Sequence, residues 1–158
     1  MSDIFSYNKI TPEIISEIKD KIGVHNVSAE AEKLESYSHD EVPANAYERE
    51  YRASLLVFPE STAHVSEIMK IASRERIPVT PRGAGTGLSG GALPVHGGIV
   101  MSFEKMNKII EIDEANLTVT TEPGVVTAEI SRAAAARGVL YAGDPSQRRR
   151  FVHRRQHR

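Results

Sequence analysis

The sequence predicts an α+β fold, and three observations support this prediction. A strand, a helix and a strand are expected within 54–59, 61–78 and 77–81, and such a unit usually has parallel strands. Three further segments, 97–103, 108–113 and 117–123, are rich in β-branched residues and separated by short polar turns, which predicts a β-meander. Because these strands do not alternate with helices, the pattern differs from a repeating βα array.

Helices are predicted from apolar spacing and from residues typical of helix ends. The segment 11–23 has Thr11 as a candidate N-cap, Pro12 in its first turn, an isoleucine stripe and a final glycine. Residues 28–38 predict a short second helix, and Thr62 is a candidate cap for the helix within 61–78. The alanine-rich segment 125–138 predicts a helix that Gly138 closes. We expect a loop at 40–53, and a short strand or loop at 139–145.

The composition indicates a soluble globular protein of one domain, or part of a larger one. No apolar run approaches the ~18 residues of a transmembrane helix. The first ten residues lack the basic and apolar regions of a secretory signal. Cysteine is absent, so disulfides and thiolate metal sites are excluded, and the histidines show no metal-ligand spacing. We therefore expect a cytoplasmic protein with no transmembrane segment and no metal site.

The last twelve residues, QRRRFVHRRQHR at 147–158, differ from the rest of the chain. They contain six arginines and no acidic residue, whereas residues 1–146 hold all 21 acidic residues and the other 14 basic ones. A basic arm that contacts nucleic acid is one interpretation. The segment has Phe151 as its single aromatic residue, which gives no platform for base stacking, so we expect no nucleic-acid partner. The other interpretation is that this tail does not belong to the preceding domain.

The segment PRGAGTGLSGG, at 81–91, has five glycines directly after a predicted strand. It is not a dinucleotide fingerprint, because Leu88 occupies the place of the third glycine and no helix follows. It is not a Walker loop either, because the lysine is missing. Glycine allows consecutive N–H groups to turn toward one anion, and Arg82, Thr86 and Ser89 add charge or hydroxyl donors. The segment is therefore either a pyrophosphate-binding loop or a glycine-rich turn without a ligand.

The order of several short motifs resembles a known family. After the first strand, helix and strand come PRGAGTGLSGGALP, GGIVMSFEKMNKIIEID, TVTTEPGV, a helix and GVLYAGDPS. This order, from about residue 10 to residue 146, resembles the FAD-binding domain of vanillyl-alcohol oxidase and PCMH-type flavoproteins. It is most similar to the glycolate oxidase subunit and D-lactate dehydrogenase group. The fold that the resemblance implies is an incomplete PCMH-type domain, in which a βαβ subdomain is followed by the start of a mixed β-sheet subdomain.

The resemblance implies FAD as the cofactor and assigns three groups of binding residues. The first group, expected to wrap the FAD pyrophosphate, is Pro81, Arg82, Gly83, Ala84, Gly85, Thr86, Gly87, Ser89, Gly90 and Gly91. The second, expected to line the cofactor, is Glu122, Pro123 and Gly124. The third, expected near the flavin ring, is Asp144, Pro145 and Ser146. The second group also fits a turn before a helix, and Asp144-Pro145 also fits a simple turn. Lys105 and Asp113 resemble family positions too, with surface and turn roles expected.

The function implied by the resemblance is oxidation of a small 2-hydroxy acid, of the glycolate or D-lactate type, by hydride transfer to the flavin. Because family members add a substrate domain that supplies most catalytic groups, we assign no catalytic residue and expect this chain alone to be inactive. The domains expected are a helical lead-in at 1–53, a partial FAD-binding domain at 54–146 and the basic tail at 147–158. The alternative is a non-enzymatic nucleotide- or polyanion-binding module with a basic arm. The sequence assigns no oligomeric state.

The tail at 147–158 departs from the family pattern, and a shifted reading frame after residue 146 is our hypothesis for it. Permitted codons for QRRRFVHRRQHR, read one base later, encode NGDASFIGGNI, which resembles the family continuation. In this hypothesis some of the arginines are glycine codons read out of frame. Coding DNA without that second reading would contradict it.

Overall fold

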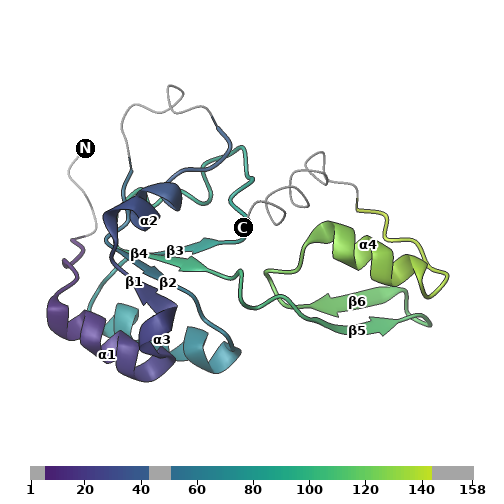
Figure 1. Cartoon of the computed structure of the whole chain (residues 1–158), viewed down its shortest axis with the longest axis horizontal. Helices are drawn as coiled ribbons and strands as arrows, with labels where there is room; N and C mark the ends of the chain where they lie inside the picture. The colour runs from purple at the N-terminus through teal and green to yellow at the C-terminus, as the bar shows by residue number, and fades with distance from the viewer. Residues whose placement is uncertain (1–5, 43–50, 144–158) are drawn as a thin grey trace. The chain divides into compact units, whose positions relative to one another are not determined.

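The computed structural model describes residues 6–42 and 51–143, which form two compact units (Figure 1). The first unit ends at Lys105, and the second begins at Met106. No helix in the described ranges is long and apolar enough to cross a membrane.

The first unit is built on a four-stranded sheet with the order β1-β2-β4-β3. The strands are β1 (Val27–Ser28), β2 (Leu55–Val57), β3 (Val79–Arg82) and β4 (Ile99–Ser102). β4 lies between β2 and β3 and is parallel to both, whereas β1 pairs antiparallel with β2. Ile99 is opposite Leu55 on one side and Val79 on the other. The expected strand–helix–strand unit is confirmed as parallel, but a third strand separates its two strands.

Helices cover both faces of this sheet (Figure 1). α1 (Pro12–Ile22) and α3 (Thr62–Arg74) pack on one face, and the short α2 (Ala31–Ser36) packs on the other. A 3-10 turn, η1 (Val24–Asn26), joins α1 to β1. Strand side chains alternate between the faces, so Leu55 and Val57 contact α1 and α3 while Leu56 lies with Leu34 of α2. A parallel sheet covered on both faces needs apolar residues at every position, and β2 and β4 are buried throughout.

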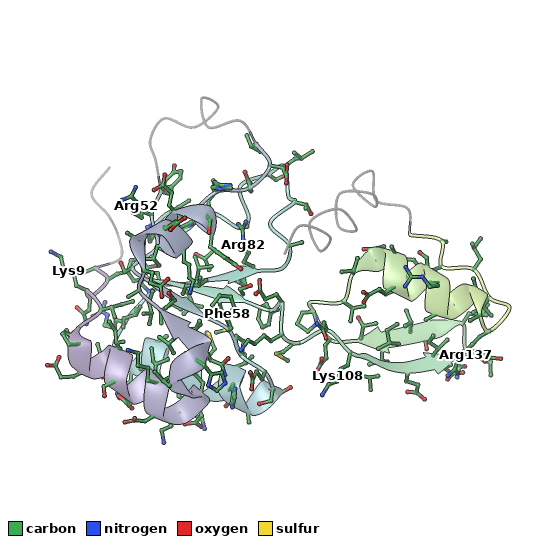
Figure 2. The ribbon with its side chains drawn as sticks, viewed as in Figure 1. Lys9, Arg52, Phe58, Arg82, Lys108 and Arg137 are labelled. Atoms are coloured by element: carbon green, nitrogen blue, oxygen red, sulfur yellow. The ribbon has the colours of Figure 1, made fainter. Side chains whose placement is uncertain are left out.

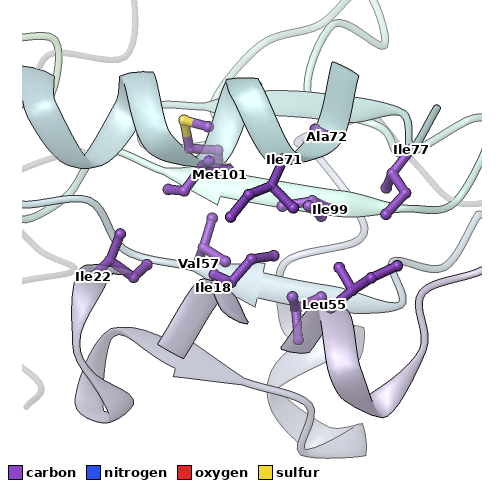
Figure 3. Packing of buried hydrophobic residues seen from close by; sticks show 11 residues of the cluster. Ile18, Ile22, Leu55, Val57, Ile71, Ala72, Ile77, Ile99 and Met101 are labelled. Atoms are coloured by element: carbon purple, nitrogen blue, oxygen red, sulfur yellow. The ribbon is translucent and has the colours of Figure 1, made fainter. Parts of the chain in front are cut away.

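The larger core cluster lies between the sheet and the pair α1 and α3. Figure 3 shows side chains of both helices converging on the strands: Ile18, Ile22, Ile71 and Ala72 meet Leu55, Val57, Ile99 and Met101. The isoleucine stripe predicted for the first helix is therefore its buried face. Since α1 and β1 belong to the core and sheet of the first unit, residues 6–28 are integral to that unit.

Helix starts agree with the sequence prediction at α1 but not at α3. Thr11 is the N-cap of α1. In α3 the N-cap is Ser61, whose Oγ accepts a hydrogen bond from the backbone N–H of His64 at 3.2 Å. Thr62 is instead the first helical residue, so the prediction of Thr62 as the cap was wrong by one position. Both residues are hydroxylated, and sequence alone did not separate them.

The second unit contains a two-stranded antiparallel hairpin and one helix. β5 (Ile109–Asp113) pairs with β6 (Thr118–Thr121), and α4 (Thr127–Ala135) follows. Ile130 and Ala134 are the buried side chains of α4. The carboxylate of Asp113 accepts hydrogen bonds from the backbone N–H and side-chain amide of Asn116, and these bonds lower the pKa of Asp113. The turn role expected for Asp113 is confirmed. Residues 139–143 have no regular structure, as a loop would.

The predicted three-stranded meander was wrong. β4 joins the parallel sheet of the first unit, and only β5 and β6 form an antiparallel pair. The burial patterns explain the difference, because β4 is buried at every position whereas β6 alternates between exposed and half-buried residues. The predicted domain boundary between residues 53 and 54 also does not coincide with the division between units at residue 105. As the limits of an FAD-binding domain, 54 and 146 stay predictions.

Two adjacent glycines before β4 allow a matched stability test. Gly97 and Gly98 have φ of +71° and +72°, so alanine is strained at both positions by about 1–2 kcal/mol. A Cβ on Gly98 would also collide with the carbonyl oxygen of Pro78, whereas a Cβ on Gly97 would come no closer than 3.6 Å to Arg52 O. We predict that Gly98→Ala lowers the free energy of unfolding by clearly more than Gly97→Ala, as measured by urea denaturation. Equal losses for the two variants would contradict the close approach of Gly98 to Pro78.

Candidate functional site

The candidate site lies at the edge of the first unit's sheet where the parallel strands end. β2, β3 and β4 run in the same direction, so the segments that follow them meet at one edge. After β3 comes the segment 83–91, which we call the glycine loop, and after β4 come Phe103 to Lys105. The backbone N–H of Phe103 donates to Arg82 O at 3.0 Å, which fixes the start of the loop against β4. In open sheets of parallel strands, ligands bind at this carboxyl edge.

Arg82, labelled in Figure 2, lies at the end of β3, and its side chain packs against Gly85 of the glycine loop. Arg82 is buried, with 4% of its surface exposed, and its guanidinium donates to His39 O at 2.5 Å. The guanidinium carbon also lies 5.5 Å from the centre of the Tyr37 ring, within cation–π range. Gly85 has φ of +70°, and a Cβ there would collide with the guanidinium. The positive φ and the neighbouring buried guanidinium therefore both favour glycine at position 85.

Three other glycines of the segment have no such internal reason. A Cβ added to Gly83, Gly87 or Gly91 would meet no atom within 4 Å, and none of the three has a positive φ. Neither steric crowding nor backbone conformation in the described residues explains glycine at these positions. Close approach of a ligand to the backbone does explain it, because a side chain would stand in the ligand's place.

The loop also presents consecutive unused hydrogen-bond donors. Within the described residues, none of the backbone N–H groups from Gly83 to Ser89 donates a hydrogen bond. Buried backbone donors are nearly always paired, and Gly85 is buried. A run of N–H groups without internal acceptors is the feature by which glycine-rich loops hold anions. The hydroxyls of Thr86 and Ser89 lie in the same run.

Arg82 therefore has a different position from the one its charge suggested. Its guanidinium points into the protein, toward His39 and Tyr37, and supports the loop from within. A buried positive charge next to the loop would attract an anion bound there, because charges interact more strongly away from bulk water. Whether Arg82 acts on a cofactor stays a prediction.

A second group of charged residues lies at the same edge of the sheet. The ammonium of Lys105 donates to Asn26 Oδ1 at 2.5 Å and to Glu60 Oε1 at 3.0 Å. The hydrogen bond from Lys105 lowers the pKa of Glu60. Asn26 is fully buried and also donates to Ile22 O at 2.7 Å. The surface role expected for Lys105 is thus incomplete, since Lys105 ties η1 to the ends of β2 and β4. Within the described ranges, no three His, Cys, Asp or Glu side chains are grouped to hold a metal ion.

The second predicted group, Glu122, Pro123 and Gly124, belongs to the second unit and forms the turn before α4. The backbone N–H of Glu122 donates to Lys108 O at 2.9 Å, and its carboxylate accepts from Lys108 N at 2.8 Å. Gly124 N donates to Met106 O at 2.8 Å. These bonds satisfy the turn interpretation, while the cofactor role of the group stays a prediction. The third group, Asp144, Pro145 and Ser146, and the tail at 147–158 lie outside the described residues.

Sequence reasoning missed the residues that support the glycine loop from the segment 37–41. Asp40 Oδ2 accepts from Gly90 N at 3.1 Å, and Glu41 N donates to Gly87 O at 3.4 Å. Tyr37 packs edge-to-face on Phe58 and donates its hydroxyl to Glu104 at 2.7 Å. No local pattern marks these residues, because the partners named here are 21 or more positions away along the chain.

Comparison with known families identifies the class of protein to which this chain belongs. Residues 53–151 match the model of a family described as FAD binding domain. The match includes the parallel strands β2, β3 and β4, the glycine loop and the second unit's hairpin and helix. The chain belongs to this family, and its cofactor is FAD.

Curated relatives identify the kind of flavoprotein. The chain is 43% identical over 110 residues to the glycolate oxidase subunit GlcD of Bacillus subtilis, and these cover 70% of this chain and 23% of the relative. It is 38% identical over 144 residues to a D-lactate dehydrogenase of Anaerostipes hadrus, covering 91% of this chain and 30% of the relative. The predicted resemblance to this group is confirmed. The chain thus spans about a quarter to a third of the length of these relatives.

Solved structures agree on the fold. An alkyldihydroxyacetonephosphate synthase matches 89% of this chain with a TM-score of 0.75 and 19% identity, and the match covers 30% of that protein. A p-cresol methylhydroxylase matches 84% of the chain with a TM-score of 0.71 and 24% identity, covering 27% of that protein. The predicted PCMH-type α+β fold is confirmed.

Two glycines of the loop should respond differently to the same substitution. We predict that Gly85→Ala lowers the free energy of unfolding by about 2 kcal/mol or more, because the new Cβ is strained at positive φ and collides with a buried guanidinium. Gly87→Ala should change it by no more than about 0.5 kcal/mol, because its Cβ meets open space. Urea denaturation of both variants tests this. A large loss for Gly87→Ala would show that the fold itself needs that glycine.

Proposed function

We propose that this chain is the FAD-binding part of an oxidoreductase that oxidises a 2-hydroxy acid such as glycolate or D-lactate, and that the glycine loop holds the FAD pyrophosphate. One observation carries the proposal for the loop. Gly83, Gly87 and Gly91 leave the backbone bare where the fold has no need of it, beside a run of unused N–H donors. Both features suit an anion that contacts the main chain itself.

The residues of the loop fit a pyrophosphate in three ways. The N–H groups from Gly83 to Ser89 would donate to phosphate oxygens, and the hydroxyls of Thr86 and Ser89 would add donors. The guanidinium of Arg82 would attract the anion from behind the backbone. The carboxyl edge of a parallel sheet would also separate the phosphates from the apolar core. No helix begins in the loop, so a helix dipole has no part in this binding.

The remaining predicted residues are assigned supporting roles. Glu122, Pro123 and Gly124 would line the cofactor through their backbone, because the carboxylate of Glu122 is bonded to Lys108 N. Asp144, Pro145 and Ser146 are proposed near the flavin ring on the resemblance alone. When bound, FAD supplies the acceptor for the hydride that leaves the hydroxyl-bearing carbon of the substrate. We assign no catalytic residue in this chain.

The substrate class rests on the relatives. The two relatives described above are a glycolate oxidase subunit and a D-lactate dehydrogenase, and both names specify a small 2-hydroxy acid. Because these proteins are more than three times as long as the matched segment, substrate binding would depend on residues beyond it. A cytoplasmic location stays a prediction from the sequence.

The proposal predicts a defined order of flavin affinities. FAD should bind the chain more tightly than FMN, and FMN more tightly than riboflavin, because FAD carries a pyrophosphate, FMN a single phosphate and riboflavin none. Gly87→Ala should weaken FAD binding by about tenfold or more, since each lost close contact to the anion removes a charge-assisted hydrogen bond. Riboflavin binding should be unchanged by the substitution, which serves as the control. Isothermal titration calorimetry measures the affinities for FAD, FMN and riboflavin, under conditions where the original chain and the variant are folded to the same extent.

Two results would contradict the proposed function. Equal affinities for FAD and riboflavin would show that the loop does not bind the pyrophosphate. Binding of inorganic polyphosphate or an RNA oligonucleotide that exceeds FAD binding would favour a polyanion-binding module instead.

A further inference from the structure

The segment 37–41 contacts the glycine loop at two points and Arg82, the residue before the loop, at a third, although the segment and the loop are far apart in the chain. The guanidinium of Arg82 donates to His39 O at 2.5 Å, at the start of the loop. Glu41 N donates to Gly87 O at 3.4 Å, near its middle. Gly90 N donates to Asp40 Oδ2 at 3.1 Å, near its end. We call residues 37–41 the support segment.

Asp40 contacts the loop through its side-chain carboxylate, whereas Glu41 contacts it through a backbone N–H. Its side chain is buried, with 7% of the residue's surface exposed, and its second oxygen accepts from Val42 N at 3.0 Å. One carboxylate therefore joins the backbone of the support segment to the backbone of the loop. Hydrogen bonds from N–H groups to a carboxylate are about twice as strong as those between neutral groups. A flexible loop rich in glycine gains most from such a fixed point, because its unfolded conformations are numerous.

The charge of Asp40 argues against direct contact with a phosphate. Two anions at short distance repel each other, and a buried site strengthens that repulsion. An aspartate beside a pyrophosphate site therefore needs another role, and its bond to Gly90 N gives one. Gly90 has φ of +75°, a left-handed conformation that glycine adopts without strain.

We propose that Asp40 is a positioning residue for FAD, which fixes the Gly90 end of the glycine loop so that the N–H groups of Gly83 to Ser89 are held ready for the pyrophosphate. This inference rests on the proposed function of the loop. Asp40 lies outside every group of cofactor-binding residues that the sequence indicated. It acts through Gly90 and does not touch the cofactor.

Ser38 provides a matched control within the support segment. It is also 7% exposed, and its hydroxyl donates to Leu34 O at 2.5 Å and accepts from Ala53 N at 3.0 Å. Ser38→Ala and Asp40→Ala thus both remove a buried polar group that joins two backbone segments. Of these two side chains, only that of Asp40 is bonded to the glycine loop. If a variant binds FAD more weakly only because it is less stable, both variants should lose affinity for FAD. If the loop's position matters, Asp40→Ala alone should lose it.

The test uses the whole 158-residue chain and measures two properties of the wild type and of Asp40→Ala, Asp40→Asn and Ser38→Ala. Affinities for FAD and riboflavin are measured by calorimetry at a temperature where each variant is folded. Amide hydrogen exchange of the glycine loop is measured without a ligand. We expect Asp40→Ala to weaken FAD binding by about tenfold or more, to leave riboflavin binding unchanged and to accelerate exchange at Gly90. Asp40→Asn retains one acceptor oxygen, so its FAD affinity should be intermediate, and this variant decides the matter if Asp40→Ala does not fold.

The outcomes separate this inference from the proposed function. A wild-type chain with no preference for FAD over riboflavin overturns the proposed function of the loop. A wild-type chain that prefers FAD, with Asp40 variants that bind it equally well or only as weakly as Ser38→Ala does, overturns the role of Asp40 alone. Unchanged exchange at Gly90 in Asp40→Ala would overturn it as well.

Discussion

The parallel pairing of β4 between β2 and β3 is the constraint on which the site depends. Because the three strands run in one direction, the segments after them meet at one edge of the sheet. The connection between β3 and β4 includes the glycine loop, which begins directly after β3 and beside the buried strand β4. The pairing requires apolar side chains on both faces, and α1, α2 and α3 cover them.

The hydrogen-bonding groups in and next to the loop fall into two sets: those bonded within the protein, and backbone N–H groups without an acceptor there. On the inner side, Arg82 is packed against Gly85 and bonded to His39, while Asp40 holds Gly90. These contacts use buried charged groups, which are costly unless they are paired or hydrogen-bonded. The N–H groups of Gly83 to Ser89, by contrast, have no acceptor within the described residues. In the proposed function these groups bind the anion, and the contacts of Arg82 and Asp40 would reduce the ordering that binding requires.

Part of this account could be predicted from the sequence, and the limits have physical causes. The isoleucine stripe of α1, the strand–helix–strand unit and the position of the glycine loop follow from local patterns, which record which face of an element is buried. The place of β4 in the sheet does not follow, because a continuous apolar strand fits any buried position and its partners lie far along the chain. Asp40 was missed for the same reason. The sequence shows five glycines in 81–91, but only the structure separates Gly85, required by Arg82, from Gly83, Gly87 and Gly91, which the fold leaves unexplained.

The most direct test of this account is to follow the backbone amides of the chain by ¹H–¹⁵N NMR while ADP is added, since ADP carries the same adenosine and pyrophosphate groups as half of FAD. The account predicts that the amide signals of Gly83 to Ser89 shift downfield together at saturation, as N–H groups do when they donate to an anion, while adenosine without phosphates leaves them unchanged. Shifts confined to other residues, or equal effects of adenosine and ADP on the loop, would contradict the claim that the glycine loop binds the pyrophosphate through its backbone.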